Sequence, residues 1–427
     1  MRVLLVSIGS LGDTLPSIAW AKELESRGHE VILGVNGYYQ PLLDRENVQY
    51  ESLWSKEEHI KMLQSTQLWK KSTSLDAHKE FFSKLLPRVH DFILRNNLPG
   101  ETVVAAQTVL AGARLAQETH GIPLASLHLQ PIFLRSIHDA TGPVERWPLW
   151  LRKGLDRVVD MVIDRWIGRP LNDYRKSLGL GSIHRSMKRW CNSPDLVINF
   201  FPDWFNPPQP DWPVNTHCVG FPFFRNQNVE FDRTAVDEFL SNGAAPIVFS
   251  VSSFTTDARS YFESSITAAQ ELGKRAIFLT PYSEQIPPSL PSTIRYFEFV
   301  PLELLLPRAA IHVHHCGSGT VALTFDAGIP HIAVPQGADQ TDIAARLERL
   351  GVSRTISPKR YTARSVVSAC RELLESTEVK SRCRELAEKS HRQDALRVAS
   401  EYLEKLVLSQ RERTPHKSEP TVYEQAI

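Results

Sequence analysis

One stretch of the chain, residues 311–340 (IHVHHCGSGTVALTFDAGIPHIAVPQGADQ), joins a glycine-rich turn to a helix, a strand and a pair of polar residues. The turn, Cys316 to Thr320, follows an apolar strand expected at 311–315. We expect a helix to open near Thr320 and a second apolar strand at 331–335. Free N–H groups at a helix N-terminus carry partial positive charge and bind phosphate without a cation. The sequence therefore predicts a diphosphate site here.

A second glycine-containing turn follows the first apolar run of the chain. Residues 2–7 read as a buried parallel strand, and the segment GSLGDTLP (9–16) leads into a helix and a second strand at 31–33. A dinucleotide site would need G-x-G-x-x-G and an acidic residue after the second strand, and the chain has neither. The turn therefore serves another chemistry.

Together these motifs resemble those of the family 1 (UDP-glycosyltransferase-like) glycosyltransferases, and the GSLGD turn is similar to the GSxGD loop of the bacterial antibiotic and sterol subgroup. The resemblance implies that His315 and its turn hold the pyrophosphate of a nucleotide sugar, while Asp339 and Gln340 hold the sugar hydroxyls. Phe299 and Val300 correspond to the stretch that contacts the uracil base of the nucleotide in that family. The donor-binding residues implied in this way are Ser253, Phe299, Val300, His315, Gly317, Ser318, Gly319, Thr320, Asp339 and Gln340.

The same resemblance makes Asp13 the candidate general base, with Ser10 and Gly12 in its acceptor loop. It implies inversion at the anomeric carbon, with a UDP- or dTDP-linked sugar as co-substrate and no other cofactor. No Asp-x-Asp motif occurs, which favours a mechanism without a metal ion. The chain departs from the family at Ser252-Ser253, where Gly-Ser is usual, and at Leu323, where plant members carry a Glu for the ribose. The second departure favours a bacterial-type enzyme and leaves the nucleotide base open.

Composition agrees with a two-domain enzyme. A chain of 427 residues exceeds the size at which a single core usually stops growing. Its 49 basic and 48 acidic residues give a net charge of +1, which provides no global attraction for nucleic acid. Five scattered cysteines, no signal-peptide pattern and no apolar run of membrane-spanning length favour a cytoplasmic protein.

We expect an α/β protein with the GT-B arrangement that the resemblance implies, two Rossmann-like β/α domains facing across a cleft. The acceptor-binding N-terminal domain would cover 1–220 and the nucleotide-sugar domain 243–410, joined by a linker at 221–242. The last helix could pack back on the N-terminal domain, and 411–427 read as a disordered tail. The strands expected are 2–7, 31–33, 102–106, 121–128, 195–199, 247–252, 276–279, 311–315 and 331–335.

Residues 145–190 bear on the acceptor. They contain eleven basic and five acidic residues, with four tryptophans and a run of aliphatic side chains between them. A basic amphipathic helix with aromatic residues can lie on a membrane surface, which would make the protein peripheral to a membrane. We favour the alternative that its apolar stripe packs on the first domain and its charges face water.

Three functions remain open. The first is an inverting glycosyltransferase that acts on a lipophilic or natural-product hydroxyl. The second is a sugar-nucleotide epimerase of the same fold, which would need a different acid/base set and no acceptor. The third is a catalytically silent partner of another glycosyltransferase, against which Asp13 and the intact donor motif argue.

Overall fold

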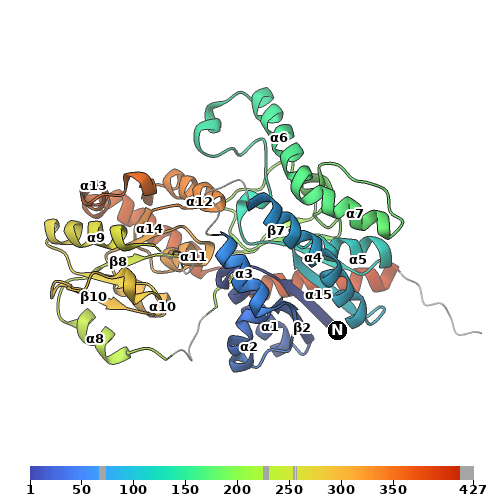
Figure 1. The fold of residues 1–427 in the computed structure, drawn as a ribbon, viewed down its shortest axis with the longest axis horizontal. Coiled ribbons are helices and arrows are strands. Elements are labelled where there is room, and N and C mark those ends of the chain that lie inside the picture. The colour runs from blue at the N-terminus through green and yellow to red at the C-terminus, as the bar shows by residue number, and fades with distance from the viewer. Residues whose placement is uncertain (67–73, 225–229, 253–254, 256, 414–427) are drawn as a thin grey trace, which may run out of the picture.

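The protein consists of two α/β domains that lie side by side (Figure 1). The computed structural model describes residues 1–66, 74–224, 230–252, 255 and 257–413. Each domain is built on its own sheet, and all paired strands are parallel. None of the described helices is long and apolar enough to cross a membrane.

The N-terminal sheet is formed by β1 (Arg2–Ser7), β2 (Glu30–Asn36), β3 (Tyr50–Trp54), β4 (Thr102–Gln107), β5 (Leu124–His128), β6 (Leu196–Asn199) and β7 (Thr216–Cys218). Its strand order is β3-β2-β1-β4-β5-β6-β7. The central strands are buried on both faces, which explains their continuous apolar sequences. The order reverses between β1 and β4, and ligands of open α/β sheets bind at such a point, beyond the carboxyl ends of the strands.

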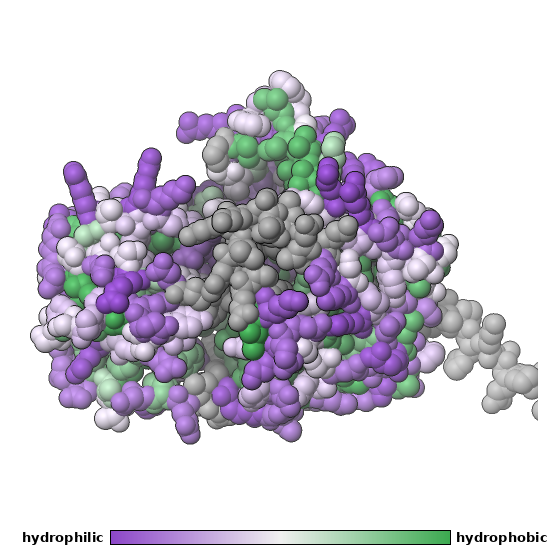
Figure 2. Space-filling model, in the orientation of Figure 1, coloured by the Kyte–Doolittle hydropathy of each residue, from purple (hydrophilic) through white to green (hydrophobic). Residues whose placement is uncertain are grey.

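Helices cover both faces of this sheet. They are α1 (Leu11–Ser26), α2 (Gln40–Glu46), α3 (Lys56–Thr66), α4 (Ser74–Asn96), α5 (Gly112–His120), α6 (Leu149–Ile163) and α7 (Arg169–Ser177). The helices α1 and α2 share one core with the sheet, and α4 and α5 share another on the opposite face. The helix α6 stands away from the body of the molecule at the top of Figure 1, and Figure 2 shows hydrophobic side chains over the same region.

The C-terminal sheet is formed by β8 (Ile247–Ser250), β9 (Ala276–Leu279), β10 (Ile294–Phe297), β11 (Ile311–His314), β12 (His331–Ala333) and β13 (Ser353–Thr355), in the order β10-β9-β8-β11-β12-β13. The helices of this half are α8 (Arg233–Ser241), α9 (Arg259–Glu271), α10 (Leu302–Leu305), α11 (Ser318–Asp326), α12 (Ala338–Arg349), α13 (Ala363–Glu375) and α14 (Thr377–His391). Large apolar cores on the two faces of the sheet join it to these helices.

The expected linker is shorter in the structure than 221–242. Residues 233–241 form α8, whose Val236, Phe239 and Leu240 are buried in the same core as Val248 and other residues of the C-terminal sheet. The apolar spacing of this helix therefore assigns it to the C-terminal domain.

The last helix, α15 (Ala395–Arg413), returns to the N-terminal domain and packs beside α1. Trp20 Nε1 donates a hydrogen bond to Ser400 Oγ at 3.0 Å. The Arg27 guanidinium binds both oxygens of Glu404 at 2.8 and 2.7 Å, and these hydrogen bonds lower the pKa of Glu404 to about 2. The helix continues through residues 411–413, which the sequence assigned to a tail, and the rest of that tail lies outside the described residues.

Candidate functional site

The turn between β1 and α1 fixes Asp13 at the start of the helix. Ser10 precedes α1 with an extended backbone, and Asp13 lies in the first helical turn. Asp13 Oδ2 accepts hydrogen bonds from the backbone N–H and from the hydroxyl of Ser10, both at 2.8 Å. A Cβ atom on Gly9 would lie 2.5 Å from the same oxygen. The glycine is therefore required for the carboxylate to approach the backbone this closely.

The other carboxylate oxygen of Asp13 faces the segment that directly follows β5 in the N-terminal domain. Gln130 Nε2 donates to Asp13 Oδ1 at 3.1 Å. A carboxylate offers about four acceptor positions, so this oxygen can take a further hydrogen bond from a ligand. Asp13 and Ser10 are half-buried, and Gly12 is exposed. The carboxylate is thus held in one orientation while part of it stays accessible.

Asp13 and Asp339 line the same cavity, although they belong to different domains. The cavity has a volume of about 250 Å³, and its wall also includes Gln107, His128 and Gln130 from the carboxyl ends of β4 and β5. Burial raises the pKa of Asp339, and the negative charge of Asp13 raises it further. The structure therefore brings the candidate base and one of the predicted sugar-binding residues to a single site.

Two of the polar residues in this cavity, His128 and Gln130, were not predicted from the sequence. His128 Nε2 lies 2.8 Å from Asn192 Oδ1, and burial lowers the pKa of His128 to about 4, so the ring is neutral at pH 7. Its Nδ1 atom is buried and has no hydrogen-bond partner in the described part of the chain. Their position at the carboxyl end of a central parallel strand was the signal that could have identified them.

The glycine-rich turn of the C-terminal domain joins β11 to α11. Cys316 adopts a φ of 68°, and its N–H donates to His314 Nδ1 at 3.1 Å, which fixes this left-handed residue. The helix α11 begins at Ser318, two residues before the expected start near Thr320. The first intrahelical hydrogen bond joins Val321 N–H to Gly317 O. The N–H groups of the preceding turn therefore point out of the N-terminal end of the helix, where they can donate to an anion.

Two buried polar atoms at this turn have no hydrogen-bond partner among the described residues. They are His315 Nδ1 and Ser318 Oγ. Burial lowers the pKa of His315 to about 4, so its imidazole is neutral at pH 7 and carries one N–H donor. A Cβ on Gly317 would lie 2.7 Å from His315 Nε2, which explains the glycine there. Because buried polar atoms are normally paired, an oxygen-rich ligand fits this position.

Behind the turn, three buried histidines support β11 and β12. His312 lies 2.8 Å from Ser250 Oγ and from Thr324 Oγ1, and His314 Nε2 lies 3.0 Å from His331 Nδ1. Burial holds the pKa of each ring well below 6.5. This arrangement is structural, and the described residues contain no group of three or more His, Cys, Asp or Glu side chains suited to a metal ion. The metal-free mechanism stays a prediction.

Asp339 and Gln340 lie in the first turn of α12. Gln340 Oε1 accepts a hydrogen bond from Gln336 N–H at 2.7 Å, so this side chain also closes the loop before the helix. Phe299 is 46% exposed and available for stacking, whereas Val300 is buried. Neither residue lines the cavity that Asp13 and Asp339 share. Ser253 lies outside the described residues, and its predicted role is untested.

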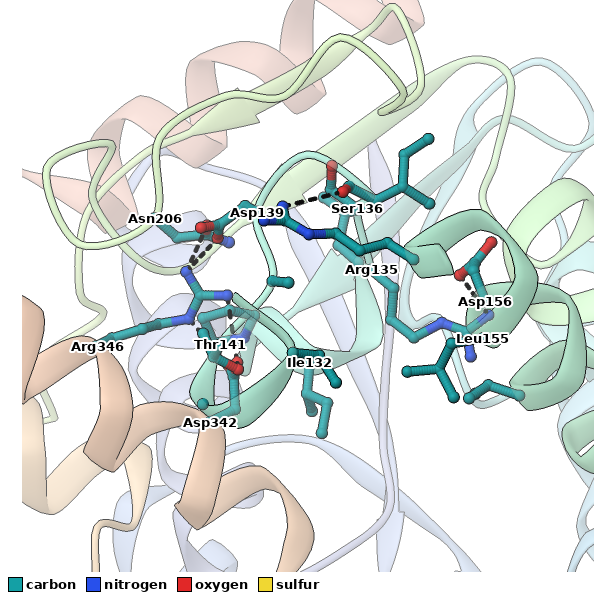
Figure 3. A pocket seen from close by; sticks show the side chains of 18 of the residues that line it. Ile132, Arg135, Ser136, Asp139, Thr141, Leu155, Asp156, Asn206, Asp342 and Arg346 are labelled. Carbon is teal, nitrogen blue, oxygen red and sulfur yellow. Dashed lines mark hydrogen bonds and ion pairs between the residues drawn. The ribbon is translucent and has the colours of Figure 1, made fainter. Parts of the chain in front are cut away.

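A second cavity, of about 330 Å³, lies between α6, the segment 131–146 and α12 (Figure 3). Arg346 on α12 is buried and donates to Asp139 at 2.6 Å and to Asn206 at 2.8 Å, both from the N-terminal domain. Thr141 Oγ1 donates to Asp342 at 2.8 Å. The helix that presents Asp339 and Gln340 is therefore tied directly to the opposite domain.

Two family models match the chain, one in each domain. Residues 3–138 match the glycosyltransferase family 28 N-terminal domain, and residues 277–404 match the C-terminal domain of erythromycin biosynthesis protein CIII-like proteins. O-mycaminosyltylonolide 6-deoxyallosyltransferase of Streptomyces fradiae is 25% identical over 385 residues, which cover 86% of this chain and 88% of that protein. Sterol 3-beta-glucosyltransferase of Saccharomyces cerevisiae (strain YJM789) is 25% identical over 98% of this chain, but the match spans only 36% of that protein.

Solved structures share the whole fold. The glycotransferase of kitacinnamycin superposes with a TM-score of 0.75 at 18% identity, covering 95% of this chain and 99% of that one. The calicheamicin glycosyltransferase CalG4 gives 0.70 at 18% identity, covering 96% and 98%. The fold is therefore GT-B, and the expectation of two Rossmann-like domains is confirmed. The chain is therefore a glycosyltransferase of the GT-B fold, with antibiotic and sterol glycosyltransferases among its relatives, as its motifs predicted.

Proposed function

We propose that the protein is an inverting, metal-independent glycosyltransferase that moves a hexose from a UDP- or dTDP-sugar to a hydroxyl group of a lipophilic natural product or sterol. The observation that carries this proposal is the single cavity lined by Asp13 from one domain and Asp339 from the other. The names of the relatives support the acceptor class, since one transfers a deoxyhexose to a tylonolide derivative and another glucosylates sterols. The glycosyltransferase VinC, which shares the fold with a TM-score of 0.68, was solved with dTDP.

The donor diphosphate would lie at the N-terminus of α11. The N–H groups of Ser318, Gly319 and Thr320 and the neutral ring of His315 are donors that can meet its oxygens. Negative charge grows on the diphosphate as it leaves, and fixed donors in a partly dry site stabilise that charge. Asp339 and Gln340 would bind the sugar hydroxyls from the start of α12.

The acceptor hydroxyl would donate a hydrogen bond to Asp13. As the hydroxyl oxygen attacks the anomeric carbon, a new C–O bond forms, the bond to the diphosphate breaks, and the proton passes to the carboxylate. Attack from the face opposite the diphosphate inverts the configuration. His128 also lines this cavity, but its Nε2 atom is engaged at 2.8 Å from Asn192 Oδ1, whereas Asp13 Oδ1 keeps a position for a further hydrogen bond.

The test is the Asp13→Asn enzyme. Asparagine keeps an oxygen that can accept the Ser10 N–H bond but cannot take a proton, so we expect kcat to fall about a hundredfold or more. Donor affinity should hardly change. The reaction is followed with UDP- and dTDP-glucose against a panel of sterol and macrolide hydroxyls, and the anomer of the product is assigned by NMR.

Ser10→Ala is the matched control, since it removes a hydrogen bond to the same carboxylate oxygen and keeps the charge. Its kcat should stay within a few-fold of the natural enzyme. Undiminished transfer by Asp13→Asn would reject Asp13 as the base. Conversion of the donor sugar without an acceptor would support the epimerase alternative instead.

A further inference from the structure

The helix α6 packs on the protein through its acidic side. Asp156 pairs with Arg185 at 3.0 Å and with Lys188 at 2.9 Å, and buried Asp160 pairs with Arg135 and Arg185. The expectation that the apolar stripe of residues 145–190 packs on the first domain therefore fails for α6. It holds farther along the segment, where Leu171, Met187 and Trp190 join a core with Leu86 and Leu115. The half-buried cations that pair with α6 attract its carboxylates inward, and the opposite side of the helix faces out.

That outer side is apolar. Trp150 is 69% exposed, Val158 53% and Met161 70%. These residues follow one another at helical spacing and occupy one face. Figure 2 shows hydrophobic (green) residues over part of the projecting region, with hydrophilic (purple) residues at its edges. The other exposed apolar residues on this side of the helix are Leu151, Leu155 and Val162, and they complete what we call the "α6 face". Trp147 and Trp166, also exposed, lie in the segments just before and after α6. Soluble proteins rarely leave such a contiguous patch without a partner.

The charges around the α6 face are mainly positive. Asp156 and Asp160 of the helix form ion pairs with cations of the protein body, so their charges are neutralised. The basic residues beside the apolar face are exposed. On the helix itself, Lys153 and Arg157 lie next to Trp150 by helical geometry. Glu145, an exposed acid nearby, pairs with Arg349 at 3.5 Å. The exposed basic residues are Arg146, Lys153, Arg157, Arg165 and Arg169.

We propose that the α6 face docks on the surface of a membrane that contains anionic lipid. A projecting amphipathic helix with tryptophans on its apolar side inserts those rings at the level of the headgroups, and basic side chains at its edge attract acidic lipids. The surface is convex and projects from the body, which suits a deformable lipid interface.

Docking would also place the second cavity at the lipid surface, because Leu155 and Val159 of α6 line it. A lipophilic acceptor could then pass from the membrane toward the domain interface. This consequence rests on the proposed function, whereas docking itself does not.

The experiment is vesicle flotation of the full chain, without any substrate. Vesicles of phosphatidylcholine with phosphatidylglycerol should bind the protein, and vesicles of phosphatidylcholine alone should bind it at least tenfold more weakly. Trp150→Glu combined with Met161→Glu should reduce binding at least tenfold, and Lys153→Glu should reduce it roughly fivefold or more, as expected for a basic residue near an anionic surface. Both positions of the double variant are highly exposed, so folding should be preserved.

The matched control is Leu408→Glu, which places the same charge at a 58% exposed apolar position on α15. It should bind vesicles like the natural chain. The proposal is overturned if the natural chain does not float with anionic vesicles, or if the double variant floats as well as Leu408→Glu does. A dimer in solution that the double variant dissociates, without vesicle binding, would overturn it in favour of a second copy as the occupant. Loss of glycosyl transfer with intact vesicle binding would affect only the proposed function.

Discussion

His315 and Gln340 should affect different parts of the donor. His315 lies at the turn before α11, where its unpartnered Nδ1 and the free N–H groups can meet a diphosphate. Gln340 lies in the first turn of α12, the helix assigned to the sugar. A hydrogen bond to a charged oxygen contributes roughly 1.5–3 kcal/mol of binding free energy. The variant His315→Ala should therefore weaken binding of free UDP or dTDP at least tenfold. Gln340→Ala should keep that affinity and lose discrimination between glucose and galactose donors.

Isothermal titration with free nucleotide and competition between the two sugar donors measure these effects. His315→Asn is the matched control, because its amide can still donate to an oxygen, and it should recover part of the affinity. Equal nucleotide binding by His315→Ala and the natural protein would contradict the assignment of the diphosphate to this turn.

At the scale of elements, the sequence predicted the centres of both sheets and missed their edges. Every strand that was predicted has two neighbours in its sheet, whereas the strands that were not predicted, β3, β7, β10 and β13, lie at the ends of the strand orders. Edge strands are buried on fewer sides, so they lack the continuous apolar run by which a central parallel strand is recognised. The three residues of β7, for example, are all only half-buried.

The candidate site follows the same division. Residues within one continuous motif, such as Asp13, the turn at His315 and the pair at Asp339, could be proposed from the sequence because each motif is contiguous and resembles a family motif. His128 and Gln130 join the site only because β5 lies next to β4 in the sheet, and that neighbourhood is a tertiary property. Burial of the acidic side of α6 depended on Arg135 and Arg185, which are remote from it in sequence, so helical periodicity alone gave the wrong orientation.

The contact between α12 and the N-terminal domain predicts a linked loss of stability and donor binding. Arg346→Met keeps much of the side-chain volume but leaves Asp139 with Arg349 alone, and Asp342 without its guanidinium. Removing one member of a buried ionic cluster usually costs about 3–5 kcal/mol of unfolding free energy. Since α12 presents Asp339 and Gln340, KM for the nucleotide sugar should rise as well.

Urea unfolding and donor kinetics test this prediction together. Asp342→Asn in the Arg346→Met background removes the carboxylate charge that was left without a cation, so it should recover part of the lost stability. Arg308→Met is a suitable control, because its ion pair with Asp237 lies at an exposed site within the C-terminal domain. Unchanged stability and unchanged KM in Arg346→Met would show that the cluster does not couple the domains.

At the scale of the whole molecule, connections run between the domains in both directions. The helix α15 belongs to the end of the chain and packs on the first sheet, while the segment 135–146 of the first domain reaches α12. One connection is largely apolar and the other is ionic. The cavity that contains Asp13 and Asp339 therefore lies between domains that are held at two separate places.

The buried histidines of both domains make the whole protein sensitive to acid. Burial lowers the pKa of His128 and His315 to about 4 and holds those of His312, His314 and His331 well below 6.5. In the unfolded chain each ring titrates near pH 6.5, so the unfolded state binds more protons below that pH. The unfolding free energy should thus be flat above about pH 7 and fall toward pH 4, by up to roughly 1.4 kcal/mol per pH unit for each ring.

Urea unfolding at pH 7, 6 and 5 measures this slope. We expect a loss of several kcal/mol over the range, because five rings contribute to it, His128 in the N-terminal domain and four rings in the C-terminal domain. Glu404, whose pKa is lowered to about 2, loses its stabilising effect only as the pH falls below the ordinary glutamate pKa, so it contributes little in this window.

His128→Asn keeps a side-chain oxygen and nitrogen but removes one titrating ring, so it should reduce the slope by about one ring's share. His184→Asn, at an exposed position, should leave the slope unchanged. A stability that is constant from pH 7 to pH 5 would mean that these rings do not titrate on unfolding, and would contradict their neutral, buried state.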